Sequence, residues 1–123
     1  MKAAQRDIIF TNYELPNGDF QPHLALVLSN NDINEYEGYY ITVMLSSTPI
    51  EDNYSFLVSP DMFNFDFKVR LKSPSHKPQI RCHLISAIKE EDLIISKRYG
   101  TMKKEFYTQV VTQITEFVFG REG

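Results

Sequence analysis

The stretch HLALVLSNND, residues 23–32, decides the fold because its pattern changes from strand to turn partway along. Its first half is a nearly continuous apolar run, which is typical of a strand buried on both faces. Its second half is polar and rich in turn-forming residues. His23 stands at the mouth of this strand, so the sequence raises the question of whether the imidazole has a chemical role.

The composition of the whole chain fits one folded domain. The 123 residues, 42% of them hydrophobic and 24% charged, predict a single domain over residues 1–123 with one core. A formal net charge of −3 excludes a general polyanion binder but allows a local basic patch. The sequence contains no membrane-length apolar run, we expect no signal peptide, and the single cysteine, Cys82, suits a reducing cytosol. We therefore expect a cytoplasmic protein with no membrane partner.

The segments around the opening stretch predict a protein that is mostly β. Strands are expected within residues 6–15, 23–30, 39–47, 54–59 and 79–88, with a further candidate at 68–71. The sequence PNGD at 16–19 is a turn signal, and the polar segment 30–38 is expected to be a loop. In an extended segment 60–67, Phe63, Phe65 and Phe67 would share one face.

The C-terminal tail has a helical period instead. Met102, Phe106, Val110, Ile114 and Phe117 recur at helical spacing, which predicts an amphipathic helix from about Met102 to Phe119. A single helical turn is expected at residues 89–93, and residues 94–100 fit either a strand or a loop. Six or seven short strands followed by one closing helix predict a small, mostly antiparallel barrel with the helix packed on an open face or end.

A basic stretch, KVRLKSPSHKPQIR at residues 68–81, is the main charge asymmetry of the chain. It contains no acidic residue, and its cations are Lys68, Arg70, Lys72, Lys77 and Arg81. Such a stretch is favourable for binding a nucleic-acid backbone, and the neighbouring phenylalanines would offer stacking surfaces to unpaired bases. The alternative is that the cations are the solvent face of a strand and the phenylalanines are core. No metal-ligand motif is present, so neither a metal nor another cofactor is expected.

The order of these segments resembles the MazF/PemK toxin family. DIIFTNYELPNGDFQPHLALVLSNND, at residues 7–32, is similar to the opening of the family, where a strand reads Arg-Pro-Ala-Leu-Val-Leu-Ser before Asn and Asp. MLSST, at 44–48, stands where the family often has Ile-Thr-Ser, and residues 89–114 resemble its ending. The resemblance implies an SH3-like barrel with a C-terminal helix and a homodimer. It also implies metal-free cleavage of single-stranded RNA and an antitoxin protein that neutralises the toxin.

The resemblance also indicates positions for the reaction, several of them substituted. The family's phosphate-binding arginine falls on His23, and its hydroxyl residue at the end of the third strand falls on Ser46. When the family's Gln-Ile-Arg-Thr-Ile-Asp block is set on LISAIK, residues 84–89, its arginine becomes Ser86 and its aspartate Lys89. These departures leave open an alternative function, in which an inactive barrel of the same fold binds nucleic acid or a partner protein.

Metal-free RNA cleavage needs a base for the 2′-hydroxyl, an acid for the leaving oxygen and a cation at the phosphate. Histidine titrates in the useful range, so the predicted catalytic residues are His23 and His83 with Arg81 and Ser46. Lys68, Arg70, Lys72 and Lys77 are the predicted nucleic-acid-binding residues. In the alternative interpretation, His23 is a strand-edge residue facing water and His83 a partly buried strand residue, while Cys82 belongs to the core.

Overall fold

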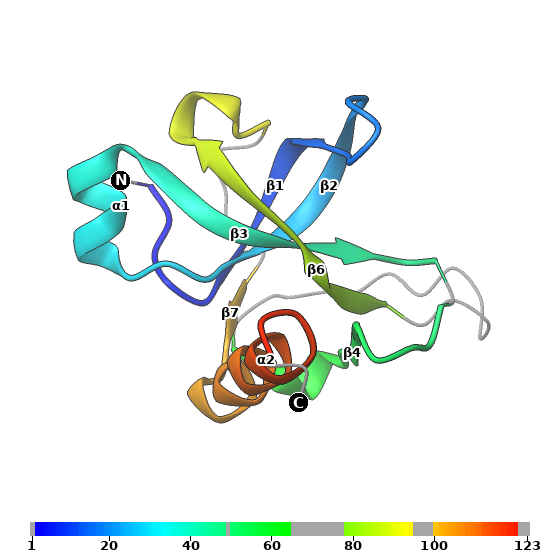
Figure 1. The fold of residues 1–123 in the computed structure, drawn as a ribbon. Coiled ribbons are helices and arrows are strands. Elements are labelled where there is room, and N and C mark those ends of the chain that lie inside the picture. The colour runs from blue at the N-terminus through cyan, green and yellow to red at the C-terminus, as the bar shows by residue number, and fades with distance from the viewer. Residues whose placement is uncertain (1, 49, 65–77, 95–99, 121–123) are drawn as a thin grey trace.

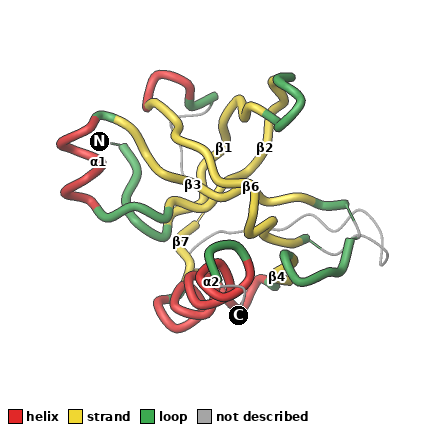
Figure 2. The backbone as a smooth tube through the Cα atoms, viewed as in Figure 1, coloured by secondary structure: helices red, strands yellow, loops and turns green. Residues whose placement is uncertain are grey.

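The computed structural model describes residues 2–48, 50–64, 78–94 and 100–120 (Figure 1). More of these residues lie in strands than in helices, and Figure 2 shows the strands crossing the middle of the molecule with the helices at its periphery. The strands are β1 (Asp7–Glu14), β2 (Phe20–Val27), β3 (Tyr39–Ser46), β4 (Ser55–Leu57), β5 (Phe63–Asn64), β6 (Gln79–Lys89) and β7 (Gly100–Met102). The helices are α1 (Asn31–Glu37) and α2 (Lys104–Phe117), with 3₁₀ turns at Pro60–Met62 and Glu90–Asp92.

All seven strands belong to one antiparallel sheet with the order β4-β6-β3-β2-β1-β7-β5. The two edge strands, β4 and β5, are separated in the sequence only by residues 58–62. At about 3.5 Å per residue such a connection spans roughly 20 Å at most, so the sheet must curl until its edges approach each other. The prediction of a mostly β fold with about seven strands and a C-terminal helix is confirmed.

The strands bury apolar side chains on both faces of the sheet. One face holds Ile8, Leu26 and Val43 and packs against Val110 and Ile114 of α2, as the apolar stripe of that helix predicts. Figure 1 shows α2 lying beside β4 and β7. The other face holds a second cluster that contains Ile9, Tyr13, Ala25, Val27, Tyr40, Met44 and Ile88. The strand in the opening stretch therefore contributes to both clusters, which is why its apolar run is nearly continuous.

The prediction of a loop at residues 30–38 is wrong, because this segment forms the helix α1. Asn30 caps the N-terminus, its side chain accepting a hydrogen bond from the backbone N–H of Ile33 at 2.9 Å. Gly38 ends the helix with φ of 76°, a left-handed conformation that glycine adopts without strain. The buried Asn34 donates to the backbone carbonyl of Ser29 at 3.3 Å. These caps and buried contacts outweigh the weak helical composition.

Several other segments bear on the predictions. The helical turn at Glu90–Asp92 is confirmed, and α2 begins two residues later than expected because Met102 belongs to β7. Phe63 is buried in the core, while Phe65, Phe67 and the predicted nucleic-acid-binding residues Lys68, Arg70, Lys72 and Lys77 lie outside the described residues. Within the described part of the chain, neither helix has the length and apolar character needed to cross a membrane.

Candidate functional site

Polar side chains form a line across the sheet on the face opposite α2. Ala25 of β2 pairs with Met44 of β3, and continuing this register by two residues places His23 opposite Ser46. Ser46 pairs in turn with Gln79 of β6, and Met44 pairs with Arg81. Cross-strand partners point to the same face of a sheet. We call His23, Ser46, Gln79 and Arg81 the polar row.

His23 is half-buried in the polar row and contacts the end of β3. Burial lowers the pKa of His23 below its usual value of 6.5, and a hydrogen bond with the backbone of Leu45 partly opposes that shift by raising it. A hydrogen bond that raises the pKa of histidine favours the charged form, so the ring is the donor to Leu45. The neutral ring therefore keeps its second nitrogen as an acceptor. A neutral imidazole that presents an acceptor nitrogen is suited to act as a general base.

Ser46 and Gln79 occupy the middle of the polar row and are tied to the turn after β3. The Ser46 hydroxyl accepts a hydrogen bond from the backbone N–H of Thr48 at 3.1 Å. The fully buried Gln79 donates from Nε2 to the Thr48 carbonyl at 2.5 Å and accepts from Arg81 through Oε1 at 3.0 Å. Gln79 thus links the turn to Arg81. The sequence does not single out Gln79 as a site residue, because a glutamine at the start of a strand gives no signal by itself.

Arg81 is the buried cation of the polar row, with only 8% of its surface exposed. Its two terminal nitrogens bind the two carboxylate oxygens of Asp52, each at 3.0 Å. Nη1 also donates to the Ser55 hydroxyl at 2.7 Å and to Gln79 Oε1 at 3.0 Å. This bidentate pair fixes the guanidinium plane and satisfies its buried charge. We call this arrangement the Arg81 clamp.

The clamp predicts how stability responds to acid. Arg81 is the main cause that holds the pKa of Asp52 at about 2, below its usual 3.8. A carboxyl group with a lowered pKa stabilises the folded state above its unfolded pKa, and this contribution is lost as the pH falls through the folded value. We expect thermal melts to show Asp52→Asn less stable than the parent protein at pH 5, with the difference shrinking between pH 4 and pH 2. A difference that is constant with pH would contradict the clamp.

His83 lies in an irregular part of β6 beside the Arg81 clamp. Arg81 pairs with Met44 while Ile85 pairs with Val43, so residues 82–84 form a bulge with no partners on β3. Bulges redirect side chains, and His83 is exposed although β6 lies between two other strands. Its ring contacts that of Tyr54, with centroids 4.8 Å apart and planes inclined by 49°. Burial and then the charge of Arg81 lower the pKa of His83.

The structure brings the four predicted catalytic residues to one region without making them one cluster. His23 and Ser46 are on neighbouring strands, and Ser46 and Arg81 are on the next pair. His83 belongs to β6, so β3 lies between it and His23. Two strand spacings are roughly 10 Å, so the backbones that carry the two imidazoles are well separated. A shared phosphate would have to bridge them.

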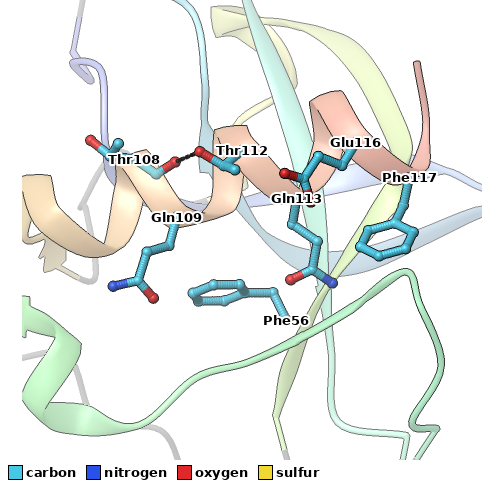
Figure 3. Close-up of a pocket in the computed structure, with 7 residues that line it drawn as sticks. All are labelled: Phe56, Thr108, Gln109, Thr112, Gln113, Glu116 and Phe117. Atoms are coloured by element: carbon cyan, nitrogen blue, oxygen red, sulfur yellow. Dashed lines mark hydrogen bonds between the residues drawn. The ribbon is translucent and has the colours of Figure 1, made fainter. Parts of the chain in front are cut away.

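The other candidate sites offer fewer groups suited to catalysis. Within the described ranges, no three histidine, cysteine or acidic side chains are grouped closely enough to hold a metal ion. Cys82 is buried as predicted, and burial raises the pKa of its thiol to about 11, which makes it a poor nucleophile. An open pocket of about 310 Å³ lies between Phe56, Phe117 and polar side chains along α2, and none of the polar row reaches it (Figure 3).

Comparisons with known proteins place this geometry in a family. The profile of the PemK-like, MazF-like toxins of type II toxin-antitoxin systems matches residues 4–118. A mycobacterial structure described as an endoribonuclease in complex with its cognate antitoxin aligns with a TM-score of 0.70 and 12% identity, covering 98% of this chain and 99% of that chain. MazE-MazF from Deinococcus radiodurans aligns with a TM-score of 0.68 and 10% identity, covering 98% and 97%.

A third structure, the Mycobacterium tuberculosis toxin MazF-mt6, aligns with a TM-score of 0.67 and 10% identity, covering 96% of this chain and all (100%) of that one. No curated protein sequence matches the chain. At such low identities, the likeness to the solved structures shows that the fold is shared over nearly the full length. The profile match shows kinship as well as a shared fold, because it rests on the sequence itself and extends from before β1 to the end of α2.

Proposed function

Because the chain belongs to the PemK-like, MazF-like toxin family of type II toxin-antitoxin systems, we propose that it is an endoribonuclease that cleaves single-stranded RNA. Its partners in this proposal are an antitoxin protein that neutralises it and a second copy of the chain in a homodimer, with the cytoplasm as its compartment. The mycobacterial structure with a cognate antitoxin supports the first partner. The observation that carries the proposal is the polar row.

The polar row also supports a different alignment of the family's Gln-Ile-Arg-Thr-Ile-Asp block. Ser86 and Lys89, the earlier matches to its arginine and aspartate, pair with Thr42 and Tyr39 at the far end of β3 from Ser46. Gln79-Ile80-Arg81 has the first three residues of the block and lies beside Ser46. In this register the arginine is retained as Arg81, and Leu84 replaces the aspartate.

The proposed reaction is an internal attack within the RNA strand. The free ring nitrogen of His23 takes the proton of a 2′-hydroxyl, and the resulting oxygen attacks the adjacent phosphorus. The bond from phosphorus to the 5′ oxygen breaks, which leaves a 2′,3′-cyclic phosphate on one fragment. The 5′ oxygen of the other fragment takes a proton from water, and His23 later releases its own to solvent. Arg81 and the Ser46 hydroxyl bind the phosphate oxygens, where charge accumulates in the transition state.

Direct assay of the purified protein tests this proposal. We expect it to cut a long unstructured RNA in the presence of a chelator, and to leave 2′,3′-cyclic phosphate and 5′-hydroxyl ends. An RNA with 2′-O-methyl groups at every position is the matched control, because the attacking oxygen is blocked. An intact unmodified RNA across pH 5 to 8 would overturn the enzymatic proposal, and cleavage of the methylated RNA would overturn the mechanism.

The pH dependence of cleavage follows from His23. The base must be neutral to accept a proton, and burial holds its pKa below 6.5. We therefore expect an acid-side decline in cleavage rate that lies below pH 6.5, with the base already neutral at pH 7. Initial rates measured on one RNA from pH 4.5 to 8 check this. A decline centred above pH 6.5 would mean that another group is the base.

One observation favours the alternative of an inactive barrel that binds nucleic acid or a partner protein. The charge of Arg81 is neutralised by Asp52, so a phosphate must compete with this carboxylate for the guanidinium. If the purified chain binds RNA without cutting it, and Asp52→Asn tightens that binding, the structure is a binding module. Growth arrest on expression of the parent chain but not of His23→Ala would instead support the enzyme.

A further inference from the structure

The rings of Tyr54 and His83 lie beside the Arg81 clamp and have no part in the reaction scheme above. Tyr54 is 38% exposed, His83 is also exposed, and the two ring centroids are 4.8 Å apart. Exposed aromatic rings next to a cationic group are the chemistry with which proteins hold unpaired bases.

The backbone around Tyr54 is fixed before any ligand binds. Its N–H donates to Asp52 Oδ1 at 2.9 Å, and its carbonyl accepts from the N–H of Cys82 at 2.8 Å. Gln113 of α2 holds the residues on either side, its Nε2 donating to the carbonyls of Asn53 at 3.0 Å and Ser55 at 2.9 Å. Figure 3 shows this side chain extending from α2 beside Phe56 of β4. Such preorganisation reduces the entropy cost of binding.

The ring pair and the clamp are parts of one surface. Arg81 and His83 are two residues apart on β6, which limits the distance between their Cα atoms to roughly 7 Å. Asp52 binds Arg81 and also accepts from the backbone of Tyr54. The charge of Arg81 helps to lower the pKa of His83, which keeps that ring neutral near pH 7 and available as an aromatic surface.

We propose that Tyr54 and His83 form a stacking subsite for one unpaired base of an RNA strand whose phosphate binds at Arg81. This proposal rests on the proposed function, from which it takes single-stranded RNA as the ligand. It gives His83 a role in binding instead of proton transfer. Stacking tolerates every base, so the subsite positions the strand without selecting its sequence.

A fluorescent reporter tests for stacking directly. The chain contains no tryptophan, so Tyr54→Trp places a single indole at the subsite. The probe is a random-sequence 2′-O-methyl RNA, which cannot be cleaved by 2′-oxygen attack. We expect the probe to quench the indole, and an abasic strand of the same length and charge to leave it unquenched. Equal quenching by both strands, or none by either, would overturn the subsite.

Binding of the same probe to ring variants separates the two roles of His83. We expect Tyr54→Ala and His83→Ala each to weaken binding by roughly 5- to 150-fold, which corresponds to about 1–3 kcal/mol for one stacked base. Tyr54→Phe and His83→Phe keep a ring and are expected to bind as the parent does. Tyr36→Ala, which removes an 87% exposed tyrosine on α1, is the control for loss of any surface ring.

Cleavage rates of unmodified RNA complete the test. At subsaturating RNA, His83→Phe is expected to cut faster than His83→Ala, because it keeps the ring that holds the strand. If His83→Phe binds normally but its cleavage falls about as far as removal of a general acid predicts, roughly 10²-fold or more, then His83 is the acid and the subsite fails. If base-dependent binding is present while no variant cuts RNA, the subsite stands and the enzymatic proposal fails.

Discussion

Replacing His23 with alanine is expected to lower the rate of RNA cleavage by roughly 10²- to 10⁴-fold, the usual contribution of a positioned general base. The imidazole is half-buried and its donor nitrogen is bound to the backbone of Leu45, so the neutral ring presents its other nitrogen as an acceptor. Alanine removes that acceptor without adding bulk to the sheet. Single-turnover rates on one RNA substrate, measured for parent and variant at pH 7, check the expectation.

Two matched variants make this result specific to proton transfer. Gln21→Ala changes an exposed residue two positions earlier on β2 and is expected to leave the rate unchanged. His23→Gln keeps a hydrogen-bonding side chain of similar reach but cannot act as a base near pH 7, so its loss should match that of His23→Ala. Thermal melts establish that the variants are folded. Normal cleavage by a folded His23→Gln would exclude His23 as the base.

Hydrophobic patterning was sufficient to predict most of the sheet. The strands around residues 7–14, 20–27, 39–46 and 79–89 were predicted because each carries enough apolar or β-branched residues to fill one or both faces. The closing helix was predicted for a related reason, since its apolar residues recur on the side that packs into the core cluster with Leu26, Val43 and Ile80. These elements are determined by local pattern, which a single sequence displays directly.

The elements that were missed depend on capping and on distant partners. The helix α1 has a polar composition, and its signals were the cap Asn30 and the terminator Gly38, which the turn-rich appearance of the segment obscured. Nothing local predicts that β6 has a bulge at residues 82–84, because the bulge is defined by pairing with β3. It is this bulge that exposes His83 instead of burying it in part.

The candidate site likewise combines features that local sequence displays with features that depend on distant partners. His23, Ser46 and Arg81 could be selected from residue type and position, yet their common face depends on the pairing of β2, β3 and β6. The partner of Arg81 could not be found by sequence spacing, because Asp52 lies in the turn before β4 and reaches β6 only through the sheet. Register likewise decides between the two alignments of the family's block, since only Gln79–Arg81 lies beside Ser46.

Replacing Arg81 is expected to affect both stability and catalysis. Arg81→Met removes the cation at the phosphate, and losing one such preorganised donor typically lowers the rate by roughly 10²- to 10³-fold. It also leaves the buried Gln79 Oε1 without its donor, which costs about 1–3 kcal/mol of folding stability. Arg81→Lys retains the charge but not the planar fork that binds both oxygens of Asp52, so its stability should fall less than that of Arg81→Met while cleavage remains impaired.

Salt dependence separates phosphate binding by Arg81 from a purely structural role. Each phosphate contact with a single strand contributes about 0.7 to the slope of log affinity against log salt concentration. Binding of the 2′-O-methyl probe to Arg81→Met should therefore lose about that much slope relative to the parent. Gln79→Ala, which weakens the clamp but keeps the guanidinium, serves as the comparison and should retain the slope. If the slope is unchanged in Arg81→Met, Arg81 does not bind the phosphate and its role is to hold the turn that carries Asp52. The phosphate would then have to bind elsewhere on the polar row.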